Sequence, residues 1–137
     1  MGERRKAREC ALQVLYAMDA SKVTAEEALK LYWQSHPEDS LEIRTFAADI
    51  VKGTSKKVEE IDNLITQYST NWKISRMSMV DRNILRFSVY ELMWCQTIPV
   101  KVTLNEAIEI AKQYGTEESG SFINGILDKV AKVSGNE

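Results

Sequence analysis

Arginine side chains gather near the start of the chain, where they could bind phosphate groups. Four of the 18 basic residues lie within five positions: Arg4, Arg5, Lys6 and Arg8. On a helix, Arg4 and Arg8 stand one turn apart with Arg5 beside them. Guanidinium groups bind phosphate oxygens through paired hydrogen bonds, and each neutralised phosphate releases counterions. The cluster indicates either a nucleic-acid contact or a solvated helix start, and charge alone does not separate the two.

One aromatic residue near the other end of the chain could stack on an unpaired base. The core stripe of the last expected helix runs through Ile123, Ile126, Leu127 and Val130, which leaves Phe122 at its margin. Stacking of a base on such a ring contributes about 1–3 kcal/mol. Packing at the edge of the core also explains this residue without any ligand, and helical periodicity by itself favours that interpretation.

The sequence offers no obvious set of catalytic or metal-binding side chains. Its one histidine, His36, precedes a proline in a connecting segment, and the two cysteines, Cys10 and Cys95, lie far from it in sequence. Nucleophilic catalysis needs such groups side by side, and a zinc site needs several of them. The run 53–56 lacks the residue order of a phosphate-binding loop. We therefore expect no enzymatic activity, no metal and no cofactor.

Length and composition predict a single globular domain in the cytoplasm. The 137 residues carry a formal net charge of −2, with 44% hydrophobic and 28% charged residues. A nucleic-acid site would therefore be a local patch and not a property of the whole surface. The two cysteines fall in apolar helical patterns, which is typical of reduced, buried thiols. No apolar run approaches the length of a membrane span, so we expect no membrane attachment.

Helical periodicity runs through the first half of the chain. A first helix is expected over 4–19, and a capping box at Thr24 begins the second. A long third helix, opening at about residue 39 or 40, keeps its register as far as residue 68 with a kink at Gly53. The run 69–71 breaks the pattern, so we place the boundary between two helical halves there.

The second half is also helical, and no alternating strand pattern competes with that interpretation. A largely apolar helix over 80–96 is the expected centre, and Ser78 provides its cap. The next helix ends at Gly115, where glycine could adopt a left-handed backbone, and Thr116 begins the last. The sequence thus predicts an all-α fold: a compact bundle of about seven helices, one domain with halves of about 1–70 and 71–137.

Two further side chains each allow two interpretations. Tyr16 lies on the flank of the first helix, where it is either a half-exposed anchor for a protein partner or a tyrosine at the core boundary. Asp81 follows Ser78 by three positions, so helix capping explains it without any partner. The residues alone leave both alternatives open.

Three stretches together form a pattern that spans essentially all 137 residues. They are RRKARECALQVLY at 4–16, DRNILR with YEL within 81–92, and NEAIEIAKQYG followed by SGSFINGILD within 105–128. In order and spacing, this chain resembles the NusB family of bacterial transcription antitermination factors. The resemblance implies a compact, all-helical, non-catalytic RNA-binding protein with two small helical halves.

The same resemblance implies partners. The expected function is to pair with NusE, a ribosomal protein of the small subunit, and to bind single-stranded boxA RNA in nascent transcripts, notably ribosomal ones. The pair would then join RNA polymerase and other Nus factors to suppress premature termination. A homodimer that hides the arginine-rich face is a further expectation that the sequence leaves open.

By position, the resemblance implies two sets of contact residues. The RNA-binding set is Arg4, Arg5, Arg8, Lys112, Gln113, Glu118 and Phe122. Tyr16 and Asp81 match positions that the family turns toward NusE. Arginines on phosphates and an aromatic ring on a base are also the physical means by which proteins bind single-stranded RNA.

Two other function classes remain as alternatives. Similar helical domains form the RNA-binding part of a ribosomal-RNA cytosine methyltransferase, but that enzyme needs a cofactor domain, and no glycine-rich strand–turn–helix follows the helices here. The other alternative is a helical protein–protein interaction module that never contacts RNA. In that case changes at the arginines and Phe122 would leave the function intact, whereas changes at Tyr16 and Asp81 would impair it.

Overall fold

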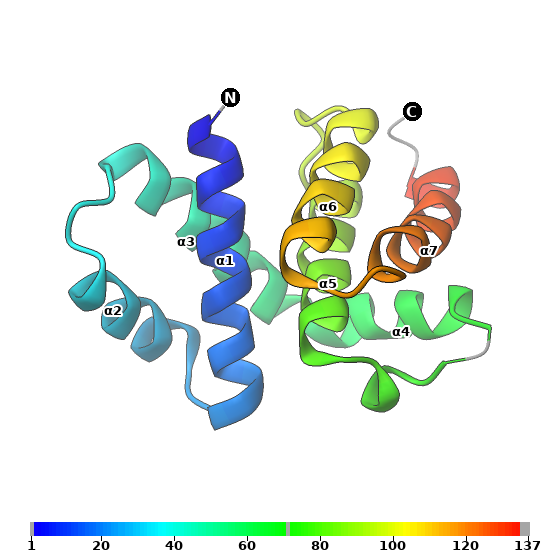
Figure 1. The fold of residues 1–137 in the computed structure, drawn as a ribbon, viewed down its shortest axis with the longest axis horizontal. Coiled ribbons are helices and arrows are strands. Elements are labelled where there is room, and N and C mark those ends of the chain that lie inside the picture. The colour runs from blue at the N-terminus through cyan, green and yellow to red at the C-terminus, as the bar shows by residue number, and fades with distance from the viewer. Residues whose placement is uncertain (1, 71, 135–137) are drawn as a thin grey trace. The chain divides into compact units, whose positions relative to one another are not determined.

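The computed structural model describes residues 2–70 and 72–134, and this part of the chain is helical almost throughout (Figure 1). Its elements are α1 (Gly2–Ser21), α2 (Ala25–Ser35), α3 (Leu41–Lys56), α4 (Val58–Tyr68), the short 3₁₀ helix η1 (Ile74–Arg76), α5 (Met79–Trp94), α6 (Val100–Tyr114) and α7 (Ser119–Ser134). The prediction of an all-α fold with about seven helices is confirmed.

Contacts between residues divide the chain into two compact units, Met1–Lys56 and Lys57–Glu137. The boundary thus follows Lys56, whereas the sequence pattern placed it near residues 69–71. The physical reason is that α4 packs against α5 and α7 and so belongs to the second unit. The long helix expected from residue 39 or 40 to residue 68 is two helices, which separate at Lys57 and not at a kink on Gly53.

The first unit packs α1 against α2 and α3. A core cluster of this unit contains Ala7, Cys10, Ile43 and Ala47, and its small alanine and cysteine side chains let α1 and α3 approach each other closely. The rings of Tyr32, Trp33 and Phe46 pack around this cluster. The helix start at Thr24 forms as predicted, since its hydroxyl accepts the backbone N–H of Glu27 at 3.2 Å.

The second unit is built around α5, which packs against α4, α6 and α7. Ser78 caps α5 by accepting the backbone N–H of Asp81 at 3.0 Å, as the capping pattern predicts. A buried hydrogen bond of 2.8 Å, from the hydroxyl of Thr103 to the carboxylate of Glu91, joins α6 to α5. Both residues are almost fully buried, so this bond satisfies a polar group within the core.

The turn between α6 and α7 requires a glycine for reasons of space. Gly115 has φ −100° and ψ −160°, so its backbone is extended and the predicted left-handed conformation is wrong. A Cβ atom there would lie 2.7 Å from the Cβ of Ser119 and 2.9 Å from the carbonyl oxygen of Ala111. Ser119 approaches this closely because its hydroxyl accepts the backbone N–H of Thr116 at 2.9 Å. Helix α7 consequently begins at Ser119 and not at Thr116.

Within the described residues, no helix combines the length and the apolar character that crossing a bilayer requires.

Candidate nucleic-acid interface

The arginines of α1 differ sharply in exposure. Arg4 is exposed and Arg5 is half-buried, whereas Arg8 is only 2% exposed. The guanidinium carbons of Arg4 and Arg8 lie 4.4 Å and 5.3 Å from the ring centroid of Phe46 on α3. At these distances the cations are attracted by the face of the ring. Phe46 therefore holds the basic start of α1 against α3, with Arg4 on the surface and Arg8 inside.

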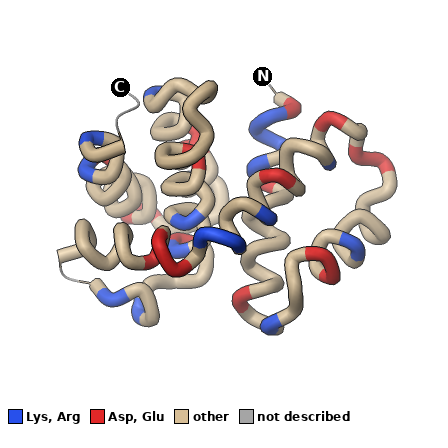
Figure 2. Tube along the Cα trace, turned by 180° about the vertical axis from the view of Figure 1, so that it is seen from behind, with Lys and Arg blue, Asp and Glu red and all other residues tan. Residues whose placement is uncertain are grey.

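Carboxylates border this basic surface. Glu3, Glu42 and Asp49 line, together with Arg4 and Phe46, a pocket of about 470 Å³ in the first unit. A side-chain hydrogen bond with Glu42, reinforced by the charge of that carboxylate, raises the pKa of Glu3. In Figure 2, basic and acidic segments accordingly stand next to each other near the N-terminus. The positive charge here is local and partly offset.

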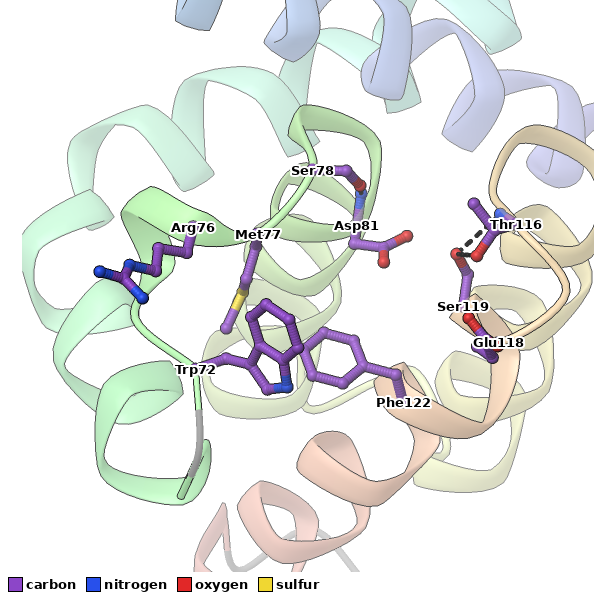
Figure 3. A pocket seen from close by; sticks show the side chains of 9 residues that line it. All are labelled: Trp72, Arg76, Met77, Ser78, Asp81, Thr116, Glu118, Ser119 and Phe122. Carbon is purple, nitrogen blue, oxygen red and sulfur yellow. Dashed lines mark hydrogen bonds between the residues drawn. The ribbon is translucent and has the colours of Figure 1, made fainter.

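The second unit contains a pocket of about 340 Å³ with an aromatic wall (Figure 3). Its lining includes Trp72, Arg76, Met77, Asp81, Glu118 and Phe122. The rings of Trp72 and Phe122 meet edge to face, with centroids 6.4 Å apart and planes at 80°. Trp72 is 52% exposed, which is unusual for so large an apolar side chain. The two rings therefore give the pocket an aromatic, apolar wall, and a base could stack on the face of either one.

Local hydrogen bonds hold these aromatic residues in place. The hydroxyl of Ser69 donates to the carbonyl oxygen of Trp72 at 2.8 Å, which fixes the chain before η1. Phe122 lies in the first turn of α7, and its backbone N–H donates to the carbonyl oxygen of Glu118 at 3.0 Å. The turn at Gly115 sets where α7 begins and so determines the position of Phe122.

Three charged residues line the same pocket, although the guanidinium of Arg76 extends away from its aromatic wall (Figure 3). Arg76 and Glu118 are exposed at its rim, and the carboxylate of Asp81 points toward the pocket (Figure 3). The Oδ1 atom of Asp81 is buried and has no hydrogen-bond partner among residues 2–70 and 72–134. A buried carboxylate oxygen without a donor costs free energy of folding.

The remaining predicted residues lie elsewhere. Lys112 and Gln113 are exposed near the end of α6, where Lys112 pairs with Glu109 at 3.4 Å, and neither lines the pocket of Phe122. Tyr16 is 41% exposed on α1. Asp81, which the resemblance assigned to the protein partner, shares its pocket with the RNA-assigned residues Glu118 and Phe122.

Sequence reasoning missed Trp72, Arg76 and Met77 as members of this pocket. Trp72 lies between α4 and η1, and connecting segments of this kind often carry binding residues. Arg76 and Met77 carry no comparable signal, because nothing in their local sequence reveals that α7 lies opposite.

These features define a small all-α protein with a candidate nucleic-acid-binding surface in each unit. The first unit has a surface of arginines whose positive charge is partly offset by nearby carboxylates, and the second has an aromatic pocket. The model of the NusB family matches residues 5–132, and the chain belongs to that family.

Curated relatives are similar in sequence to this chain over nearly its whole length. The transcription antitermination protein NusB of Syntrophus aciditrophicus is 52% identical over 128 residues, covering 93% of this chain and 79% of that protein. The NusB protein of Myxococcus xanthus is 44% identical over 134 residues, which are 96% of each chain.

Solved structures agree with the fold. T. maritima NusB superposes with a TM-score of 0.87 at 38% identity, covering 95% of this chain and 91% of that one. A crystal structure of the antitermination factors NusB and NusE in complex with dsRNA gives a TM-score of 0.88 at 28% identity, covering 96% and 98% of the two chains.

Proposed function

We propose that this protein is a non-catalytic transcription antitermination factor that binds RNA together with NusE. The observation that carries the proposal is its similarity, over 96% of its length, to a NusB protein solved with NusE and dsRNA. The antitermination role is proposed because its relatives are transcription antitermination proteins, one of which is 52% identical. We further propose that the natural target is a single-stranded boxA element in nascent ribosomal transcripts and that the complex acts on RNA polymerase with other Nus factors.

The two surfaces suit this role in different ways. Arg4 and Arg5 would bind phosphates, because their guanidinium groups lie at the surface or near it. Phe122 would stack on an unpaired base, with Glu118 beside it. Lys112 and Gln113, both exposed, would add contacts farther along the strand.

Arg8 would contribute indirectly. Only 2% of its surface is exposed, and its guanidinium lies 5.3 Å from the centroid of Phe46. We propose that Arg8 holds the start of α1 on Phe46, while Arg4 on the same ring reaches RNA.

Tyr16 would contact NusE. Its ring is 41% exposed on α1, and tyrosine is favoured at protein interfaces because it combines a large apolar ring with a hydroxyl. By resemblance, Asp81 would join Tyr16 in the contact with NusE.

The test is fluorescence anisotropy with a boxA-like single strand, a scrambled strand and a double strand, each with and without NusE. We expect selective binding of the boxA strand, strengthened by NusE and reduced by Arg5→Ala or Phe122→Ala. Lys132→Ala is the matched control, because this exposed lysine pairs with Asp128 on the surface of α7. Equal, weak binding of all three strands, with NusE still bound through Tyr16, would favour a helical interaction module instead.

A further inference from the structure

A groove of about 550 Å³ lies between the start of α6 and the end of α7, which meet at one end of the second unit (Figure 1). Its apolar lining is aliphatic and consists of Pro99, Val100, Leu104 and Ala131. It shares no residue with either of the two pockets that Phe122 lines. A ligand in this groove therefore leaves the aromatic pocket free.

Positively charged side chains border the groove. Lys101 and Lys132 line it together with one carboxylate, that of Asp128. Lys101 is exposed and makes no hydrogen bond or ion pair within residues 2–70 and 72–134. Lys132 pairs with Asp128 at 3.5 Å, but both side chains are more than half exposed, and such a surface pair contributes little free energy. Both ammonium groups can therefore pair with a carboxylate of another molecule.

The backbone at the start of α6 adds to this positive character. The first N–H groups of a helix have no acceptor within it, and they carry a partial positive charge. Pro99 is the N-cap of α6 and provides no side-chain hydrogen bond to these groups. Among the described residues, the first turn of α6 also contains no acidic side chain. This helix start therefore favours a negative group at the end of the groove that Lys101 borders.

We propose that the groove binds a segment of a partner protein in which an aliphatic side chain is flanked by carboxylates. The aliphatic side chain would be buried against Val100, Leu104 and Ala131, and the carboxylates would pair with Lys101 and Lys132. This contact goes beyond the RNA and NusE contacts proposed above and does not depend on them.

Two other occupants fit the groove less well. None of the described residues that line it is aromatic, so an unpaired base has no ring on which to stack. A second copy of the chain, joined through the same face, would bring the lysines of both copies together. Like charges that face each other across an interface cost free energy, so this arrangement is disfavoured.

The test is an NMR titration of the isotope-labelled full chain with a short synthetic peptide in which leucine is flanked by glutamates. We expect amide chemical-shift changes at Val100, Lys101, Leu104 and Ala131 and none at Phe122. Peptides with glutamine in place of the glutamates, or serine in place of the leucine, should each bind about tenfold more weakly, because charge pairing and aliphatic burial contribute on this scale.

A matched pair of variants tests the charge of the groove. Lys101→Glu should weaken binding of the glutamate peptide about tenfold, because it places like charges opposite each other. The fold should tolerate this change, since Lys101 is exposed and an acidic residue suits a helix start. Lys30→Glu makes the same change of charge at an exposed position of α2 that does not line the groove, so it should leave binding unchanged.

Equal binding of the glutamate and glutamine peptides, or equal effects of Lys101→Glu and Lys30→Glu, would overturn the proposal. Shift changes at the groove on addition of single-stranded RNA alone would assign it to RNA. Shift changes on raising the protein concentration alone would assign it to a second copy. Both of these results would also overturn the proposal, whereas the proposed function stands or falls separately on the binding of the boxA-like strand.

Discussion

The two units carry candidate surfaces of different kinds. In the first, exposed Arg4 and half-buried Arg5 stand on α1 with carboxylates close by, and no flat apolar surface accompanies them in its pocket except the ring of Phe46. In the second, the aromatic pair of Trp72 and Phe122 borders a pocket that also holds a carboxylate. Charge attracts any phosphate backbone, whereas a shaped pocket distinguishes bases. We therefore expect the first unit to supply affinity and the second to supply selectivity.

The largest expected effect comes from the turn that positions the aromatic pocket. Gly115→Ala would place a Cβ 2.7 Å from that of Ser119 and 2.9 Å from a backbone oxygen, so the start of α7 must shift. We expect a loss of about 3 kcal/mol in the free energy of unfolding, measured by urea denaturation. Gly125→Ala is the matched control, since no atom lies within 4 Å of its added Cβ, and it should stabilise the protein by about 1 kcal/mol. Equal effects of the two changes would contradict this account of the turn.

The second prediction compares two arginines on the same ring. Arg8→Gln should lower the free energy of unfolding by about 2 kcal/mol, because a buried guanidinium and its contacts are lost. Arg4→Gln, on the exposed side of Phe46, should cost less than about 1 kcal/mol. Thermal and urea unfolding of both variants check this order, and a larger loss from Arg4→Gln than from Arg8→Gln would contradict the stabilising role of Arg8.

The third prediction concerns the aromatic ring itself. Phe122→Leu keeps an apolar side chain of similar size but removes the stacking face, and should weaken binding of single-stranded RNA by about 1–2 kcal/mol. Unfolding experiments serve as the control, since the half-buried position should tolerate leucine. Unchanged affinity would mean that Phe122 only packs at the edge of the core.

The smallest expected effect is a pH dependence in the first unit. The pKa of Glu3 is raised by its hydrogen bond with Glu42, so Glu3 becomes protonated earlier than an ordinary glutamate as the pH falls. Loss of this negative charge beside Arg4 reduces the repulsion of phosphates. RNA binding should therefore strengthen modestly as the pH is lowered from ~7 to ~5. The same titration of Glu3→Gln should be flatter, and an identical slope would place the titrating group elsewhere.

Much of the local structure followed from the sequence. Thr24 and Ser78 cap α2 and α5 as their patterns predict, because capping depends on residues only three positions apart. Periodicity could also have placed Arg8 inside, since it precedes the buried Ala11 and Leu12 by three and four residues. The positive charge of Arg8, taken alone, instead favours a contact with RNA.

The features that sequence reasoning missed depend on contacts between distant segments. Asp81 and Phe122 belong to different helices, and only the packing of α5 against α7 reveals that they line one pocket. The extended backbone of Gly115 likewise follows from the approach of Ser119 and not from a local turn preference. The boundary after Lys56 is set by the packing of α4, which its own sequence does not encode.

The division of affinity and selectivity is tested most directly by one measurement on two variants. Binding of a boxA-like strand and of a scrambled strand is measured at several salt concentrations, with NusE present, for a double variant Arg4→Gln/Arg5→Gln and for Phe122→Leu. We predict that the arginine variant has a shallower salt dependence and an unchanged ratio of the two affinities, since phosphate contacts carry no sequence information. Phe122→Leu should reduce the ratio and leave the salt dependence unchanged. If both variants reduce affinity and selectivity in the same proportion, the two units do not act separately and the account is wrong.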